Sequence, residues 1–292
     1  MRHVLDVDDL GPADLAAVLD LAEAAPTPVL AGRGAALIFE KPSNRTRNAT
    51  EMAVVGLGGH PVTIRAEEIG LGVREPVADV TRVLAAYHAV VGARVFEHRV
   101  LEEMAALDVI PVLNLLSDVA HPTQAVADLL TLRQHWGGIA GRTLAWVGDG
   151  NNVCRSLTLA AAMAGVTIRL ACPAGHHLDP VAVDGARRHG PVEVCATPAE
   201  AVDGADAVVT DTWVSMGQEG EVATRRDAFA GYTVDRRLMG AAGPGAVFLH
   251  CLPAHRGEEV TAEVIDGPQS LVWQEAANRM HAARGVLSWM LA

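Results

Sequence analysis

The sequence is short of cysteine, of basic charge and of long apolar runs, and each shortage excludes a class of protein. Its four cysteines show no CxxC or zinc-like spacing, so reduced thiols are favoured over a disulfide framework. The net charge of −12 argues against nucleic acid or an anionic membrane as a partner, since both favour a basic face. No apolar run reaches the roughly 18 residues of a membrane span, and residues 1–9 are too acidic for a signal peptide. We therefore expect a cytoplasmic protein with no membrane or nucleic-acid partner.

Short apolar runs alternate along the chain with helical patterns. This alternation is typical of βαβ units and predicts an α/β fold with mainly parallel sheets flanked by helices. With 292 residues, half of them hydrophobic, the chain is long enough to bury two cores. The predicted strands cover residues 37–39, 62–64, 90–92, 109–113, 144–147, 167–171, 192–195, 207–210 and 247–250.

A cluster of glycines between residues 137 and 141 predicts a domain boundary, because it follows a predicted helix over residues 123–135. We therefore predict a first domain over residues 1–136 and a second over residues 137–273. Apolar residues at helical spacing predict a last helix over residues 274–292, which we expect to pack back onto the first domain.

The stretch Ser43-Asn44-Arg45-Thr46-Arg47 stands where an extended apolar run ends and an amphipathic pattern begins. A helix that starts there presents unpaired backbone N–H groups and the positive end of its dipole, and the hydroxyls and guanidinium groups add further donors. The stretch is therefore typical of a pocket for a multiply charged oxyanion such as phosphate. Taken alone, it is equally well explained by a serine that caps the helix and by arginines on a solvated first turn.

Four further polar motifs stand at the ends of predicted strands, where ligands bind in an open parallel sheet. They are His121-Pro122-Thr123-Gln124, Gly148-Asp149-Gly150-Asn151-Asn152, Asp211-Thr212-Trp213-Val214-Ser215-Met216-Gly217 and His250-Cys251-Leu252-Pro253. With the stretch at 43–47, their order and spacing resemble the aspartate/ornithine carbamoyltransferase family from near residue 35 to the C-terminus. The triplet at 215–217 resembles the ornithine branch of that family. The resemblance implies two α/β domains with the active site in the cleft between them, and a homotrimer with sites at its subunit interfaces.

The resemblance also implies that the first domain binds carbamoyl phosphate. Such a site needs donors for the phosphate, donors for the oxyanion that develops on the carbonyl, and partners for the amide NH₂. Arg94, His121 and Cys251 have catalytic roles in this resemblance. The implied residues that bind carbamoyl phosphate are Ser43, Asn44, Arg45, Thr46, Arg94, His121, Gln124, Cys251, Leu252 and Arg279.

The second domain is implied to bind the amino-acid substrate. Its ammonium needs an anion, its carboxylate needs donors, and the reacting amine must lose a proton from a pKa near 10. By resemblance, Asp211 and Ser215 contact the α-ammonium, while Asn152 and the Met216 N–H contact the α-carboxylate. The full implied set is Asn152, Asp211, Ser215, Met216, Cys251 and Leu252.

Without the resemblance, two of these residues have simpler explanations. Arg94 follows a buried-looking strand, where a structural ion pair with Glu97 or Glu102 is equally plausible. His121 precedes a proline and is then best explained as a turn residue. Gln124 lies one helical turn beyond His121, so both side chains can face one pocket, which favours the functional interpretation.

The sequence indicates neither a cofactor nor a metal. Gly148-x-Gly150 after a strand is similar to a dinucleotide fingerprint, but no third glycine follows at the expected place, and there is no Walker P-loop. His250, Cys251 and His255 lack the acidic or cysteine pair that would complete a metal site. The transfer reaction requires no covalent intermediate on Cys251.

Several positions depart from the pattern of the family. Asn44 stands in place of a threonine and Thr50 in place of an aromatic residue. Gly70 replaces a glutamine or histidine in a loop that reaches a neighbouring subunit in family members. Ala277 replaces the glutamate two residues before Arg279. None of these positions contacts the amino acid in the resemblance.

The resemblance therefore implies transfer of the carbamoyl group of carbamoyl phosphate to the side-chain amine of L-ornithine, which yields L-citrulline and phosphate in arginine biosynthesis or urea-type metabolism. One alternative is a carbamoyltransferase for another ω-amino acid or a diamine. Another is a non-catalytic paralogue that keeps the fold for binding. The sequence favours an enzyme, because a non-enzyme has no physical reason to keep seven polar residues together: Arg45, Arg47, Arg94, His121, Gln124, Asp211 and Cys251.

Overall fold

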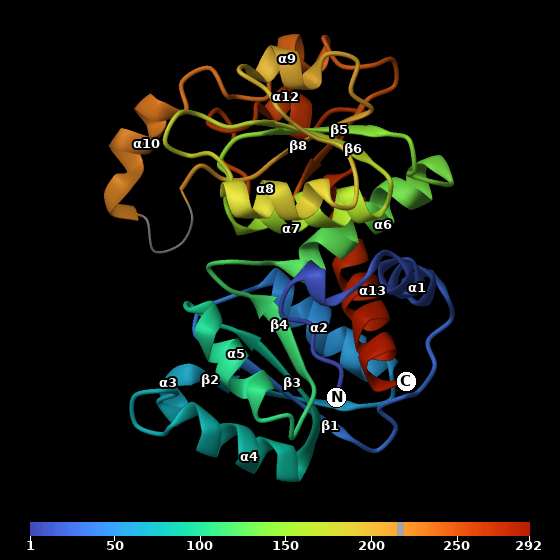
Figure 1. Cartoon of the computed structure of the whole chain (residues 1–292), viewed down its shortest axis with the longest axis vertical. Helices are drawn as coiled ribbons and strands as arrows, with labels where there is room; N and C mark the ends of the chain where they lie inside the picture. The colour runs from blue at the N-terminus through green and yellow to red at the C-terminus, as the bar shows by residue number, and fades with distance from the viewer. Residues whose placement is uncertain (215–218) are drawn as a thin grey trace. The chain divides into compact units, whose positions relative to one another are not determined.

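The computed structural model describes residues 1–214 and 219–292, which form two compact α/β units (Figure 1). The first unit consists of residues 1–130 and 277–292, and the second of residues 131–276. The division falls within helix α6 (Pro122–Trp136), whereas the glycines that suggested a boundary in the sequence follow that helix. Helix α13 (Val272–Leu291) likewise contributes residues to both units.

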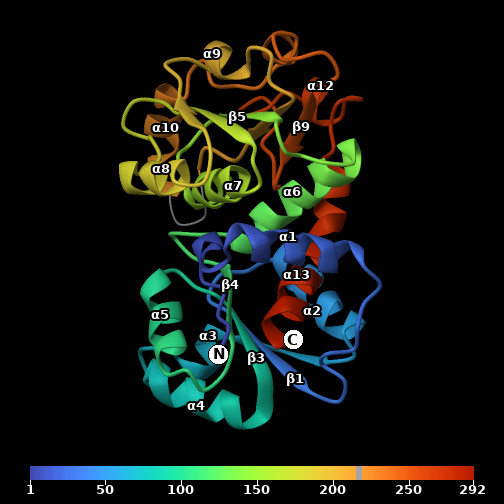
Figure 2. The same ribbon diagram turned by 45° about the vertical axis from the view of Figure 1, so that its right-hand side comes forward.

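The first unit is built on a four-stranded parallel sheet in the order β2-β1-β3-β4. Its central strand β1 is buried along almost its whole length, as expected for a parallel strand covered on both faces. Helices α3, α4 and α5 cover one face, and α1, α2 and α13 cover the other (Figures 1 and 2). The strands are β1 (Gly34–Phe39), β2 (His60–Arg65), β3 (His88–Arg94) and β4 (Val112–Leu116). The other elements are η1 (Val7–Asp9), α1 (Pro12–Glu23), α2 (Arg45–Gly56), α3 (Ala66–Ile69), α4 (Val77–Tyr87) and α5 (His98–Ala106).

The second unit has a five-stranded parallel sheet in the order β7-β6-β5-β8-β9. Helices α7 and α8 lie on one face of this sheet, and α9 and α12 lie on the other (Figures 1 and 2). The strands are β5 (Thr143–Val147), β6 (Thr167–Ala171), β7 (Val192–Val194), β8 (Ala207–Thr210) and β9 (Val247–His250). The other elements are α7 (Asn152–Met163), α8 (Pro180–Arg187), α9 (Pro198–Val202), η2 (Glu219–Glu221), α10 (Val222–Ala228), α11 (Arg236–Met239) and α12 (Ala262–Ile265).

The predicted α/β class, with two parallel sheets flanked by helices, is confirmed. The strand predicted over residues 109–113 is displaced, because β4 begins at Val112. Pro111 explains the shift: it has no N–H to give to a sheet, and it contributes only its carbonyl, which accepts from the Val91 N–H at 2.9 Å. Among the residues that the structure describes, no helix combines the length and the apolar character needed to cross a membrane.

The motif Gly148-x-Gly150 has a structural explanation that involves no nucleotide. Gly148 follows β5 with φ +144°, a backbone conformation that side chains disfavour. A Cβ on Gly150 would lie 2.2 Å from the Leu178 nitrogen and 2.5 Å from the His177 carbonyl carbon. The second glycine therefore lets the loop after β5 pass close to a neighbouring backbone segment.

We predict that Gly150→Ala lowers the free energy of unfolding of the second unit by about 1–3 kcal/mol, because overpacking against backbone forces a shift. Urea unfolding followed by tryptophan fluorescence measures this, since Trp146 is buried in the same unit. Gly138→Ala is the matched control, because a Cβ at Gly138 meets nothing within 4 Å. Equal stability of the two variants would contradict the explanation.

Candidate functional site

In the first unit, polar side chains from β3 and the start of α2 meet at the carboxyl edge of the sheet. Arg94, the last residue of β3, donates from Nη1 to the Thr46 hydroxyl at 3.3 Å and to the Ser43 hydroxyl at 3.5 Å. Arg94 and Thr46 are buried. The N-cap of α2 is Asn44 and no side chain caps the helix, so the alternative in which Ser43 is the cap is wrong. The guanidinium group of Arg94 therefore faces the start of this helix.

Arg279 of α13 reaches the same hydroxyl from another direction. Its Nη2 donates to Thr46 Oγ1 at 2.7 Å and lies 3.3 Å from His121 Nε2. Its Nη1 donates to Gln124 Oε1, and Gln124 in turn donates from Nε2 to Asp128 Oδ1 at 2.7 Å. All five side chains are buried. Two guanidinium groups thus converge on one hydroxyl, an arrangement suited to a multiply charged oxyanion.

His121 is held as a neutral ring in this cluster. Its pKa lies well below the ordinary value, because burial disfavours the charged imidazolium and because Arg279 and Arg94 add positive charge nearby. A guanidinium group only donates hydrogen bonds, so Nε2 acts as the acceptor of Arg279 and the ring proton lies on Nδ1.

Two residues of the predicted phosphate site lie at the rim of this cluster. Asn44 is exposed, and its Oδ1 accepts from Asn48 Nδ2 at 3.1 Å. Arg45 is half-buried at the first position of α2. The neighbouring Arg47 is exposed and pairs with Glu51 at 2.8 Å. The structure therefore joins Ser43, Thr46, Arg94, His121, Gln124 and Arg279 in one network of contacts.

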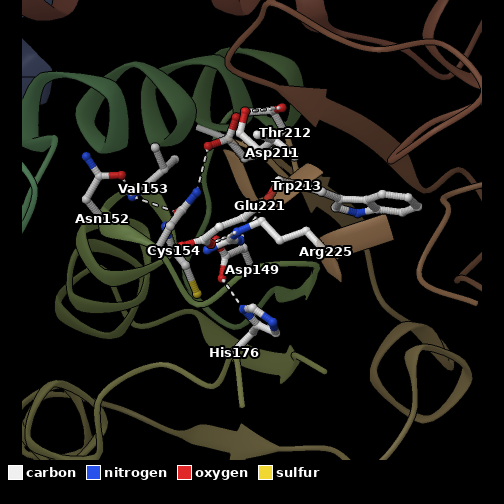
Figure 3. A network of polar contacts seen from close by, with 12 residues as sticks. Asp149, Asn152, Val153, Cys154, His176, Asp211, Thr212, Trp213, Glu221 and Arg225 are labelled. Carbon is white, nitrogen blue, oxygen red and sulfur yellow. Dashed lines mark hydrogen bonds and ion pairs between the residues drawn. The ribbon is translucent and has the colours of Figure 1, made fainter. Parts of the chain in front are cut away.

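In the second unit, three strand ends bring together a carboxylate, an amide and a thiol. Asp211 follows β8 and is buried. Its Oδ2 accepts from Asn151 Nδ2 at 2.9 Å, and its Oδ1 accepts from the Cys251 thiol at 3.0 Å. Asn152 (Figure 3) is the first residue of α7, directly follows the N-cap Asn151 and is half-buried. This arrangement presents an anion and polar amides to a ligand.

The loop after β9 has a conformation that the side chain of His250 supports. Leu252 has a positive φ of +59°, and its N–H donates to His250 Nδ1 at 2.9 Å. The other ring nitrogen, Nε2, lies 3.1 Å from Glu259 Oε1, and the His250 N–H donates to Glu275 Oε2 at 2.9 Å. Two buried carboxylates therefore hold the segment that carries Cys251 and the Leu252 carbonyl.

A metal does not fit these side chains well. Asp211, His250 and Cys251 place one potential ligand atom each within 4.8 Å of one another. Both ring nitrogens of His250 are engaged within the protein, by the Leu252 N–H and by Glu259. The Nδ1 atom of His255, the other residue weighed for such a cluster in the sequence, lies 3.1 Å from the Thr212 hydroxyl. The predicted residues Ser215 and Met216 fall outside the described residues.

Sequence reasoning missed several residues that support these clusters. Asn151 and Asp149 belong to a motif that was recognised, but only the structure shows that Asn151 contacts Asp211. Asp128 lies one helical turn beyond Gln124, a spacing that signals a side-chain pair. Glu259 and Arg225 belong to no local motif, so no signal in the sequence identified them.

Comparisons with known proteins match both units. Residues 2–134 match the family described as aspartate/ornithine carbamoyltransferase, carbamoyl-P binding domain, and residues 140–290 match the Asp/Orn binding domain of the same family. An ornithine carbamoyltransferase of Acidothermus cellulolyticus is 48% identical, with 100% of this chain and 97% of the relative covered. A crystal structure of ornithine carbamoyltransferase from Thermus thermophilus is 44% identical, with a TM-score of 0.91 over 100% of this chain and 99% of that one. The enzyme from Pyrococcus furiosus is 40% identical, with a TM-score of 0.93 over 98% and 96% of the two chains.

The depressed pKa of His121 predicts that its imidazole stays neutral as the pH is lowered through 6.5, the ordinary value. Nitrogen-15 NMR of histidine-labelled protein should show the neutral Nδ1–H form below that pH, with His121→Gln used to assign the signal. Because the unfolded chain takes up the proton first, the stability that this group contributes is present above pH 6.5 and falls as the pH is lowered further. Protonation of His121 at or above pH 6.5 would contradict the assignment.

Proposed function

The chain belongs to the aspartate/ornithine carbamoyltransferase family. We propose that it transfers the carbamoyl group of carbamoyl phosphate to the side-chain amine of L-ornithine. The products are L-citrulline and phosphate. The observation that supports this most directly is the convergence of Arg94 and Arg279 on the Thr46 hydroxyl. Two buried guanidinium groups at the start of a helix match the charge of a phosphate dianion.

Carbamoyl phosphate would bind to the first unit with its phosphate at Ser43, Asn44, Arg45 and Thr46. Its carbonyl oxygen would face Arg94 and His121, where charge builds as the amine attacks. Each preorganised donor of this kind lowers the activation free energy by about 3 kcal/mol. The Gln124 amide is already oriented, because Nε2 donates to Asp128 and leaves Oε1 on the side of Arg279. That oxygen suits the NH₂ of the carbamoyl group, whose other partner would be the Leu252 carbonyl.

The amino acid would bind to the second unit. Asp211 would hold the α-ammonium together with Ser215, and Asn152 would hold the α-carboxylate together with the Met216 N–H. Cys251 and the Leu252 carbonyl would contact the reacting amine. The amine attacks the carbonyl carbon in its neutral form, the bond to the phosphate oxygen breaks, and the departing phosphate accepts the proton. No residue of the protein is required as a dedicated general base.

Formation of citrulline supports a place in arginine biosynthesis. We also infer a cytoplasmic homotrimer, as in the family that the sequence resembles. The departure at Gly70 has a local cause in this chain: its φ is +61°, and a Cβ there would lie 2.6 Å from the Arg74 Cβ. A longer side chain at this position would strain the turn, so a contact with a neighbouring subunit would have to use other residues of the loop.

The proposed function predicts a strict order of substrates. With carbamoyl phosphate, a colorimetric ureido assay should detect product from ornithine more readily than from lysine or 2,4-diaminobutyrate. Putrescine should be poorest, because it has no α-carboxylate and cannot make the contact proposed for Asn152. Preference for another ω-amine would support the alternative carbamoyltransferase, and no product from any amine would support a non-catalytic paralogue.

Replacement of Asp211 tests the proposed contact with the amino acid. Asp211→Asn keeps the size of the side chain and removes its charge, so ornithine loses a charge-assisted hydrogen bond of about 1.5–3 kcal/mol. We expect kcat/KM for ornithine to fall roughly tenfold to hundredfold, with little change in carbamoyl phosphate affinity. Asp203→Asn makes the same substitution at an exposed position of the same unit and should behave like the parent. Intact ornithine kinetics in Asp211→Asn would refute this contact.

A further inference from the structure

Arg225 is an arginine buried in the second unit, where its guanidinium group joins the helix that carries it to two other segments. It belongs to the short helix α10 and is 7% exposed. Its Nη1 donates to Asp149 Oδ2 and to the Trp213 carbonyl, each at 2.8 Å, and its Nε donates to Glu221 Oε2 at 3.0 Å (Figure 3). A planar group with fixed donors holds such partners in a defined geometry, which a lysine cannot do.

The partners of Arg225 are adjacent in sequence to residues of the proposed amino-acid site. Asp149 lies in the loop after β5, which continues into Asn151 and Asn152. Trp213 lies two residues after Asp211, in the segment that follows β8. Arg225 therefore links the loop that would hold the α-carboxylate to the loop that would hold the α-ammonium. The hydrogen bond from Asn151 to Asp211 is a second link between the same two loops.

Charge gives this link a further role. Asp149 is buried, and burial raises its pKa, while Arg225 acts in the opposite direction and Asp211 adds to the increase. His176 lies 3.8 Å away, a weaker partner than Arg225 at 2.8 Å. Arg225 therefore offsets part of the effect of burial on Asp149 and favours the charged form of that carboxylate.

Aromatic packing fixes the position of the helix that carries Arg225. The Trp213 and Phe229 rings are stacked with centroids 5.5 Å apart, and His176 packs against Phe229 at 4.9 Å. Phe229 is the residue that ends α10, and it is fully buried. The guanidinium group is thus held between Asp149 and a rigid aromatic cluster, and its side chain has little freedom to move.

We propose that Arg225 is a positioning residue for the amino-acid substrate, which sets the relative placement of Asp211 and Asn152 through Asp149 and the Trp213 carbonyl without itself contacting the substrate. This inference rests on the proposed function, because it assumes that the ammonium and carboxylate of ornithine bind to those two residues.

Kinetics of Arg225→Gln test the proposal, with Arg226→Gln as the matched control. Arg226 is the next residue of the same helix, is exposed and pairs with Glu258 at 2.5 Å. We expect Arg225→Gln to raise KM for ornithine tenfold or more, while calorimetry gives a Kd for carbamoyl phosphate within twofold of the parent. Arg226→Gln should keep both constants. An ornithine KM within twofold of the parent in Arg225→Gln would overturn the proposal.

Arg225→Lys separates positioning from a general loss of structure. A lysine keeps the charge beside Asp149 but cannot reach three partners together, so its ornithine KM should lie between those of the parent and Arg225→Gln. A fall in kcat, together with equal losses of affinity for both substrates in Arg225→Lys, would indicate a merely structural role and overturn the proposal. A parent inactive with every amine would overturn the proposed function as well. An active parent whose ornithine KM survives Arg225→Gln would overturn only the role of Arg225.

Discussion

The cost of burying two arginines side by side is the constraint on which the first unit depends. Arg94 and Arg279 come from a strand and a helix that are far apart in sequence, yet both donate to the Thr46 hydroxyl. Like charges in a buried site repel, and each is expensive to desolvate. An arrangement of this kind is stabilised by an anion, which is why we propose that the phosphate of the substrate binds there. The same two charges, with burial, keep His121 neutral.

The proposed site in the second unit contains two buried carboxylates, Asp149 and Asp211. Burial and, to a smaller extent, the charge of Asp211 raise the pKa of Asp149, and the buried cation Arg225 acts in the opposite direction. The two proposed substrates have matching needs: carbamoyl phosphate brings negative charge, and an amino acid brings an ammonium group. The groups proposed to contact each substrate thus carry the charge opposite to it: Arg94 and Arg279 for the phosphate, and Asp211 for the ammonium.

Much of this could be predicted from the sequence, because its signals are local. Alternation of apolar runs identified the parallel sheets, and the polar motifs do follow β1, β4, β5, β8 and β9, where such sheets bind ligands. The displaced strand at Val112 shows how one proline shifts a boundary. What the sequence could not show were partners distant in the chain. Nothing near Arg225 indicates that it contacts Asp149, and nothing near His250 points to Glu259. Such pairs depend on tertiary packing, which produces no repeating pattern of residues in the sequence.

The positions that depart from the family pattern also have contacts that the sequence alone does not show. Asn44 and Gly70 looked like weakened contacts in the sequence, but each has a use within this chain. The Asn44 amide pairs with Asn48 one turn along α2, and Gly70 occupies a left-handed turn that closely approaches Arg74. Ala277 leaves Arg279 without an acidic neighbour in sequence, yet the structure links Arg279 through the Gln124 amide to the buried carboxylate of Asp128. Arg279 of α13 is thus joined to a carboxylate of α6 through an intervening amide, a connection between residues that are far apart in the sequence.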